Sequence, residues 1–166
     1  MDKELSNIIN VNLYDTDVYA EYGYENREQV QQSFVDTVKS MADAKPLKEK
    51  LTLLVTKPKG TKIDNDRFRK AYGNTLAYIV STKTNEMKRC LFTGIVFFVV
   101  AIALLALNVF VFASVGGMLY AVTNLLAFVF GFVGVEALSL ELIQLVIEIK
   151  KYKRIMSVEI RIIDAN

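Results

Sequence analysis

One long stretch of the chain lacks the mixture of apolar and polar positions found elsewhere: Cys90–Val135 contains no Asp, Glu, Lys or Arg. A membrane crossing needs about 20 apolar residues, and a helix that is apolar on every side lies in lipid or deep inside a protein. Small turn-forming residues cluster at 114–117, where Gly116 and Gly117 can adopt the positive φ angles of a tight reversal. The pattern predicts an α-helical membrane hairpin with two transmembrane helices, spans at about 91–113 and 118–138, and a turn at 114–117.

Hydrophobic residues continue past the second span with the alternating spacing of a coiled-coil seam: Leu138, Leu142, Leu145, Ile149, Tyr152 and Met156. A second row precedes the first span: Phe68, Tyr72, Leu76, Ile79, Lys83 and Met87. The two rows predict helical stalk extensions below the membrane. In a hairpin that closes at 114–117, residues at equal depth have numbers that sum to about 231. Ile79 is therefore expected beside Tyr152, and Lys83 beside Glu148, with the seam either within one chain or between subunits.

The same pairing rule places the few polar residues of the hairpin. Asn108 falls opposite Thr123 and Asn124, and a polar pair of this kind contributes about 1 kcal/mol in lipid. A strip of small side chains follows on the second span: Ala127, Gly131 and Gly134. Small residues let helices approach closely, so the strip predicts a helix interface, either within the hairpin or between copies of the chain.

Glu136 is the first charged residue after the apolar stretch, about one helical turn inside the expected membrane interface, opposite Ile95 and beside Gly94. A carboxylate at that depth costs roughly 1–3 kcal/mol unless it reaches water, pairs or faces a water-filled cavity. We expect it to extend toward the cytoplasmic headgroups or to pair with a basic flank. The alternatives are a ring of Glu136 side chains that lines a pore in an oligomer assembled through the small-residue strip, or a proton or partner site.

Alternation of period two predicts strands at 7–14, 18–24, 51–56 and 157–164. A helical stripe, with Asn26 as its N-cap, consists of Val30, Phe34, Val38 and Met41. Asp64 can cap a further helix that begins near Asn65, although 75–82 is rich enough in β-forming residues to be a strand instead. These elements predict a small cytosolic α+β domain.

The order of the elements predicts that the hairpin is inserted into this domain, because the last strand follows the second span. The expected organisation is a cytosolic α+β domain with a pre-membrane helix at 1–89, the transmembrane hairpin at 90–138, and a cytosolic extension at 139–166 whose final strand completes the domain. Movement of the domain would then be transmitted to both spans.

The composition offers little material for chemistry. A net charge of +2 is too balanced to predict nucleic-acid binding, and a chain with one Cys and no His has no intrachain disulfide and no Cys/His metal site. The basic segment at 57–62 lacks the second glycine and the GK[ST] order of a phosphate loop. No Ser or Cys has a histidine base. We therefore expect no catalysis, cofactor or metal, and the N-terminus does not resemble a signal peptide.

Basic residues flank both spans, whereas the turn carries no charge: Lys83, Lys88, Arg89, Lys150, Lys151, Lys153 and Arg154. The bias of Lys and Arg toward the cytoplasm predicts a cell (inner) membrane protein with both termini cytoplasmic. The expected role is a non-catalytic sensor or effector module that couples ligand or partner binding to the hairpin, as a homo-oligomer. The alternatives are an adaptor or immunity-like subunit that packs against another membrane protein and, more weakly supported, a membrane enzyme.

Overall fold

The structure, a computed structural model, describes residues 7–13, 18–20, 27–46, 50–59, 63–112 and 116–165. The chain divides into two compact units, Met1–Thr82 with Ile149–Asn166, and Lys83–Glu148. We call them the sheet unit and the hairpin unit. The turn expected at 15–17, residues 21–24 of the second expected strand, and the expected helix cap Asn26 lie outside the described residues.

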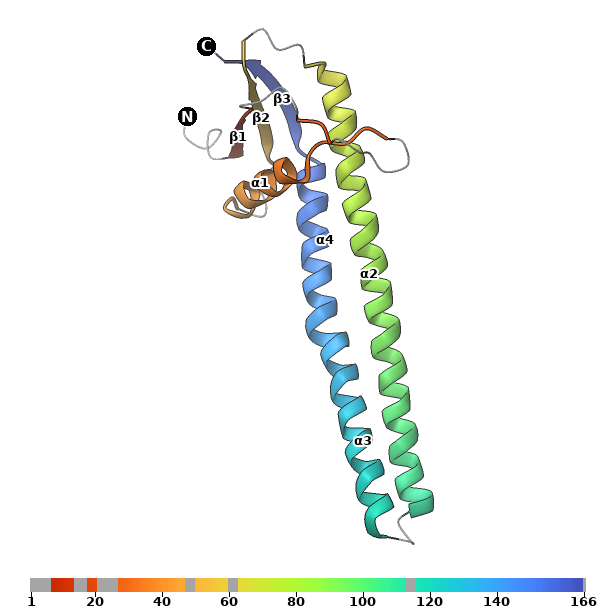
Figure 1. Cartoon of the computed structure of the whole chain (residues 1–166). Coiled ribbons are helices and arrows are strands. Elements are labelled where there is room, and N and C mark those ends of the chain that lie inside the picture. The colour runs from red at the N-terminus through yellow and green to blue at the C-terminus, as the bar shows by residue number, and fades with distance from the viewer. Residues whose placement is uncertain are drawn as a thin grey trace. The chain divides into compact units, whose positions relative to one another are not determined.

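Three parallel strands form the sheet, in the order β1 (Ile8–Asn12), β2 (Thr52–Lys57) and β3 (Glu159–Asp164) (Figure 1). The register places Leu53 between Ile9 and Ile160, and all three side chains are buried. The three strands occur where the alternation predicts them, with ends shifted by one or two residues. Alternation does not give strand direction, so the all-parallel arrangement is a result of the structure alone.

Of the second expected strand the structure describes residues 18–20, which form a single antiparallel bridge between Tyr19 and Val30. Helix α1 (Gln32–Asp43) consequently begins later than the predicted cap at Asn26, and Val30 is in extended backbone rather than in the helix. Tertiary hydrogen bonds explain this correction. The Val30 N–H donates to Thr75 Oγ1 at 2.9 Å. Two residues earlier in the chain, the Glu28 carbonyl oxygen accepts a hydrogen bond from Asn74 Nδ2 at 3.0 Å.

Helix α2 (Asn65–Leu107) includes 75–82, which settles that segment as helix rather than strand. The Asp66 N–H donates to Asp64 Oδ1 at 3.0 Å, as expected of a capping residue. Four side chains of α2 at three- and four-residue spacing are buried in the core of the sheet unit, namely Phe68, Tyr72, Leu76 and Ile79. This apolar face outweighs the β propensity of the segment, because tertiary packing supplies most of a helix's stability.

The remaining elements are a π-helical segment η3 (Asn108–Phe112), helix α3 (Gly117–Glu136), a second π-helical segment η4 (Ala137–Glu141) and helix α4 (Leu142–Met156). Gly116 and Gly117 have φ angles of 60° and 76°, so the positive φ angles expected at the reversal are present. The two π-helical segments were not predicted, since one extra residue in a helical turn leaves no mark in hydrophobic spacing.

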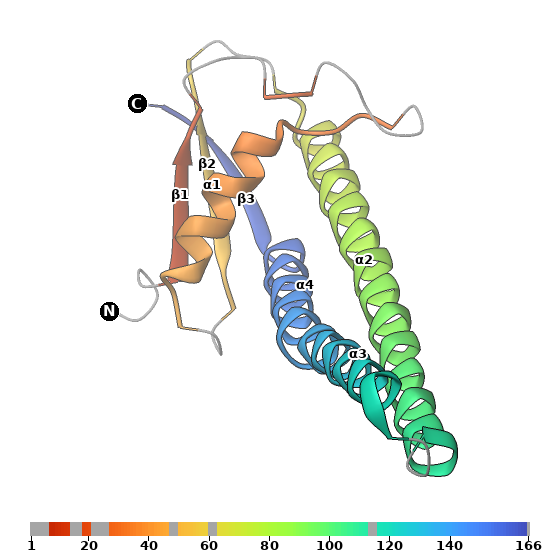
Figure 2. The same ribbon diagram turned by 60° about the horizontal axis from the view of Figure 1, so that its bottom comes forward.

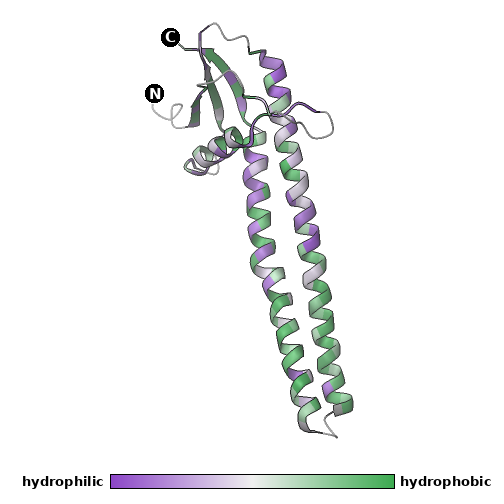
Figure 3. Cartoon of the chain, in the orientation of Figure 1, coloured by the Kyte–Doolittle hydropathy of each residue, from purple (hydrophilic) through white to green (hydrophobic). Residues whose placement is uncertain are grey.

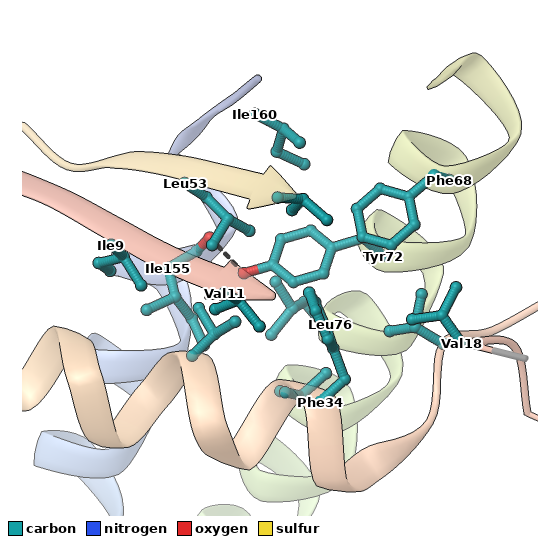
Figure 4. Packing of buried hydrophobic residues seen from close by; sticks show 14 of the residues in the cluster. Ile9, Val11, Val18, Phe34, Leu53, Phe68, Tyr72, Leu76, Ile155 and Ile160 are labelled. Atoms are coloured by element: carbon teal, nitrogen blue, oxygen red, sulfur yellow. Dashed lines mark hydrogen bonds between the residues drawn. The ribbon is translucent and has the colours of Figure 1, made fainter. Parts of the chain in front are cut away.

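Helix α1 lies along one face of the sheet (Figure 2) and contributes Phe34 to the core. The Phe34 ring meets those of Phe68 and Tyr72 edge-on, with centroids 5.6 and 6.2 Å away (Figure 4). The Tyr72 hydroxyl donates a hydrogen bond to the Ile155 carbonyl oxygen at 3.1 Å. That carbonyl belongs to the last turn of α4, where helical partners run out, and burial raises the pKa of Tyr72.

The seam predicted on α4 needs one correction. Ile149 and Tyr152 are buried in the core as expected, but Met156 is 46% exposed and Ile155, at 1%, takes its place. A helix turns about 100° per residue, so residues three and four positions after Tyr152 lie on either side of the seam. The sheet covers the side on which Ile155 lies.

Two basic residues of α4 that belong to the predicted basic flank of the second span bind the end of α1. Arg154 Nη1 donates to the Ala42 carbonyl at 3.1 Å, and Arg154 Nη2 donates to the Pro46 carbonyl. Lys151 Nζ lies 2.9 Å from Asp43 Oδ2. Cations near the last carbonyls of a helix are favoured by its dipole, so these contacts fix α1 against α4.

Removing the Tyr72 hydroxyl tests how much this single bond secures α4 to α2. Tyr72→Phe should lower the free energy of unfolding of the sheet unit by about 1 kcal/mol, because a hydrogen bond is lost and the Ile155 carbonyl stays buried. Thermal unfolding followed by circular dichroism measures the effect. Tyr152→Phe is the matched control, since its hydroxyl makes no hydrogen bond among the described residues. Equal shifts in both variants would contradict the assignment.

Candidate functional site

The hairpin unit consists of two helices whose apolar side chains point outward on nearly every side. Both helices, 65–111 and 117–156 when their π-helical segments are included, are long and apolar enough to cross a membrane by length and composition. Figure 3 shows hydrophobic residues along both helices near the closing turn and more hydrophilic ones along the parts of both that are farther from it. Large apolar side chains with more than three-fifths of their surface exposed include Phe92, Phe110, Met118 and Phe128.

The two helices approach closely at a pair of glycines. A Cβ atom built on Gly134 would lie 3.0 Å from the Phe98 backbone N and 3.1 Å from the Gly94 carbonyl O. A Cβ built on Gly94 would lie 2.7 Å from Leu138 Cγ. No side chain fits between the backbones at this level. Gly94 was expected to leave space for Glu136, but Leu138 and Ala137 fill that space instead.

The small-residue strip of α3 faces α2 of the same chain. Ala127 is 2% exposed, Gly134 is buried, and a Cβ on Gly131 would lie 3.6 Å from Ala101 Cβ. The sequence left open whether the strip packs within the hairpin or between copies, and the structure uses it within the hairpin. Ala101, itself 4% exposed, is the partner residue on α2 that the sequence analysis did not single out.

A polar contact lies near the closing end of the hairpin. Asn108 is 3% exposed, and its Oδ1 accepts a hydrogen bond from Thr123 Oγ1. Asn108 Nδ2 is buried and has no hydrogen-bond partner among the described residues. Asn124 does not join this contact, because it lies on the exposed side of α3. The structure therefore brings together Asn108 and Thr123, and separates Asn124 from them.

Glu136 is exposed and makes no hydrogen bond or ion pair with the described residues. Its neighbour Ala137 faces α2, and the Ala137 carbonyl accepts a hydrogen bond from Cys90 Sγ at 3.1 Å. Cys90 Sγ also lies 3.5 Å from Glu141 Oε2. The structure thus places Glu136 on the opposite side of α3 from the strip that was expected to assemble a pore, so the two features do not act at one interface.

Lys83 and Glu148 lie at the base of the hairpin unit. Lys83 Nζ is 3.3 Å from Glu148 Oε2 and 3.0 Å from Glu86 Oε2. Hydrogen bonds to two carboxylates raise the pKa of Lys83, with the bond to Glu86 as the larger cause and the bond to Glu148 as the second. The other stalk residues singled out from the sequence, Ile79 and Tyr152, are both buried in the core of the sheet unit of one chain.

One polar hollow of about 470 Å³ lies on the sheet unit, lined by Arg27, Glu28, Arg67, Lys70, Ala71 and Asn74. Arg67 Nε lies 2.8 Å from Glu28 Oε2, and the guanidinium stacks over Tyr19 with its centre 4.5 Å from the ring centroid. The hydrogen bond from Arg67 lowers the pKa of Glu28. The sequence did not predict the ion pair between Arg67 and Glu28, because the two residues are far apart along the chain. It joins the segment before α1 to α2, which is a structural role.

Among the described residues, no cluster of three or more His, Cys, Asp or Glu is placed to hold a metal ion. Comparisons with protein families, curated proteins and solved structures find no match to this chain. The function is therefore inferred from the geometry of the hairpin and of the sheet.

Two glycine substitutions test the close contact between α2 and α3. Gly134→Ala should lower the thermal stability of the hairpin by the equivalent of about 1–3 kcal/mol, because its Cβ would meet backbone atoms that cannot rotate away. Gly131→Ala should be neutral or stabilising by up to about 1 kcal/mol, since the site has room and Ala favours helix. Unfolding in detergent, followed by circular dichroism, compares the two. A larger loss in Gly131→Ala would contradict the packing described.

Proposed function

We propose that the chain is a two-pass membrane protein and that its hairpin unit crosses the bilayer twice. The outward-facing apolar side chains support this proposal. Phe110 is 84% exposed, Met118 83%, Phe128 72% and Phe92 70%, and these residues lie on both helices. Soluble monomers rarely expose contiguous apolar patches of more than a few hundred Å². In lipid, apolar side chains are not exposed to water and need no further protein layer to cover them. Helices can cross the lipid because they satisfy their own backbone hydrogen bonds.

The proposed orientation has both termini in the cytoplasm of a cell with an inner membrane. Basic residues before the first span and after the second support it, among them Lys88, Arg89, Lys150 and Lys153, whereas the segment 114–117 carries no charge. Lys151 and Arg154 are engaged with α1, but their charge still counts toward the bias, because the rule depends on the position of Lys and Arg along the chain.

The proposed role is that of a non-catalytic sensor or effector module. One observation carries it: β3, which follows the hairpin, pairs with β2, which precedes it, with Leu53 opposite Ile160. The sheet is complete only when the chain has passed through both apolar helices and returned. Helix α2 contributes Phe68 and Tyr72 to the core of the sheet unit, and its later residues form the hairpin. Binding of a ligand or partner to the sheet unit would therefore bias the hairpin.

Reporter fusions test the orientation. Alkaline phosphatase fused after Asn166 should be inactive and green fluorescent protein at the same position fluorescent, since the C-terminus is expected in the cytoplasm. Inserting either reporter at 114–117 should reverse both results. Phosphatase activity from the C-terminal fusion would contradict the orientation, and recovery of the chain in the soluble fraction would contradict membrane insertion.

Hydrogen exchange tests the coupling. If the hairpin and the sheet influence each other, Gly134→Ala should increase amide exchange in β2 and β3 severalfold at a temperature where the hairpin remains helical, because displacement of α3 is passed to α4 and β3. Gly131→Ala should leave exchange unchanged. Mass spectrometry of the full chain in nanodiscs measures both. A destabilised hairpin with an unaltered sheet would contradict the coupling and favour an adaptor that uses the hairpin only as a docking element.

A further inference from the structure

A groove of about 930 Å³ runs along the side of the hairpin unit, between α2 and α3. From α2 it is lined by Phe98, Ile102 and Leu105, which follow one another at intervals of four and three residues. Ile102 is 53% and Leu105 47% exposed, so the described residues leave this row partly uncovered. The row begins at Phe98, whose backbone meets Gly134, and continues away from that contact along α2.

Helix α3 supplies the other row, and its spacing is that of a coiled-coil seam. The residues are Ala121, Asn124, Phe128, Gly131 and Val135, separated by three, four, three and four positions. The small side chains at Ala121 and Gly131 flank the larger Asn124 and Phe128, so a second helix can place large groups against small ones. A hairpin that presents one such row from each helix has the surface of half a four-helix bundle.

Asn124 identifies what can occupy the groove. Its side chain is exposed, lines the groove, and makes no hydrogen bond with the described residues. The neighbouring polar residue Thr123 is directed to Asn108 and so is not available to it. An amide in hydrocarbon has a cost unless it is hydrogen-bonded, and a lipid acyl chain offers no donor or acceptor. The occupant must therefore carry a polar group at the same depth.

A second copy of this chain satisfies that requirement. A carboxamide is both donor and acceptor, so two Asn124 side chains related by a two-fold axis complement each other. Both copies have the same orientation in the membrane, so the two-fold axis that relates them lies along the membrane normal. A two-fold interface uses the same patch on both partners. A single Asn in an apolar helical seam is also a known means of fixing register and oligomeric state.

We propose that two chains dimerise through this groove, with the α3 seams facing each other and Asn124 hydrogen-bonded to Asn124 of the second copy. The inference rests on the proposed membrane insertion, because an amide exposed to water needs no such partner. The small-residue strip contributes to it in part, because Gly134 is packed against α2 of the same chain whereas Ala127 and Gly131 line the groove.

The experiment measures self-association of the full chain in liposomes at decreasing protein-to-lipid ratio, by energy transfer between donor- and acceptor-labelled copies. Asn124→Leu should weaken dimerisation roughly five- to thirtyfold, the effect of a polar pair in lipid, and Asn124→Gln should retain most of the affinity. Val122→Leu is the matched control, because Val122 is 42% exposed at a similar depth and does not line the groove.

Disulfide formation gives a second readout in a Cys90→Ser background. Asn124→Cys should yield a covalent dimer on mild oxidation, and Val122→Cys should yield little. Resistance to alkaline carbonate extraction is measured for every variant, so that membrane insertion is judged separately. An inserted chain that stays monomeric, or an Asn124→Leu variant that associates like the wild type, would overturn the dimer and leave the membrane proposal intact. Extraction of the wild type by carbonate would overturn both.

Discussion

The pairing of β2 with β3 is the constraint on which the rest of this structure depends. Leu53 lies opposite Ile160 in a parallel pair, and the Glu159 N–H donates to the Leu51 carbonyl at 3.3 Å where β3 begins. Parallel strands cannot be joined by a tight turn. The connection between β2 and β3 consists of α2, the reversal, α3 and α4. The returning helices therefore have to bring the chain back beside β2. The strand β3 can pair with β2 only if the lengths of the outward and returning helices match.

That match is maintained along the hairpin by contacts at a constant register. Asn108 meets Thr123, Cys90 lies near Glu141, and Lys83 pairs with Glu148, and the residue numbers of each pair sum to 231. Polar contacts of this kind are individually weak. Between these contacts the two helices approach closely only because glycine is present, since no side chain fits where the backbones meet. Register is thus set by a few polar pairs, and separation by small residues.

The sequence predicted the features that depend on local pattern. The apolar stretch predicted the two long helices, and Gly116 and Gly117 predicted the positive φ angles at the reversal. Simple antiparallel geometry predicted which residues of the two helices meet at the three polar contacts named above. What failed depends on distant partners. Val30 has helical spacing, but it forms a bridge with Tyr19 and its N–H donates to Thr75. Met156 has the spacing of the α4 seam, but Ile155 is buried in its place. Such competition cannot be seen in a periodic pattern.

The candidate site was predictable to the same extent. The strip on α3 could be located from the sequence, but its partner could not, because small residues permit close contact without specifying which helix makes it. The choice became clear from Gly94 and Ala101, which lie on α2 opposite Gly134 and Gly131.

Depth then decides what each unpaired polar group can do in the proposed bilayer. Glu136 lies at the end of α3, within reach of water, so its carboxylate can stay hydrated without a partner. Asn124 lies nearer the middle of α3, and its short side chain cannot extend that far. A residue turns about 100° around the helix from its neighbour, so Thr123 and Asn124 cannot both face Asn108. One polar residue fixes the fold of the hairpin, and the next is left to favour a second chain.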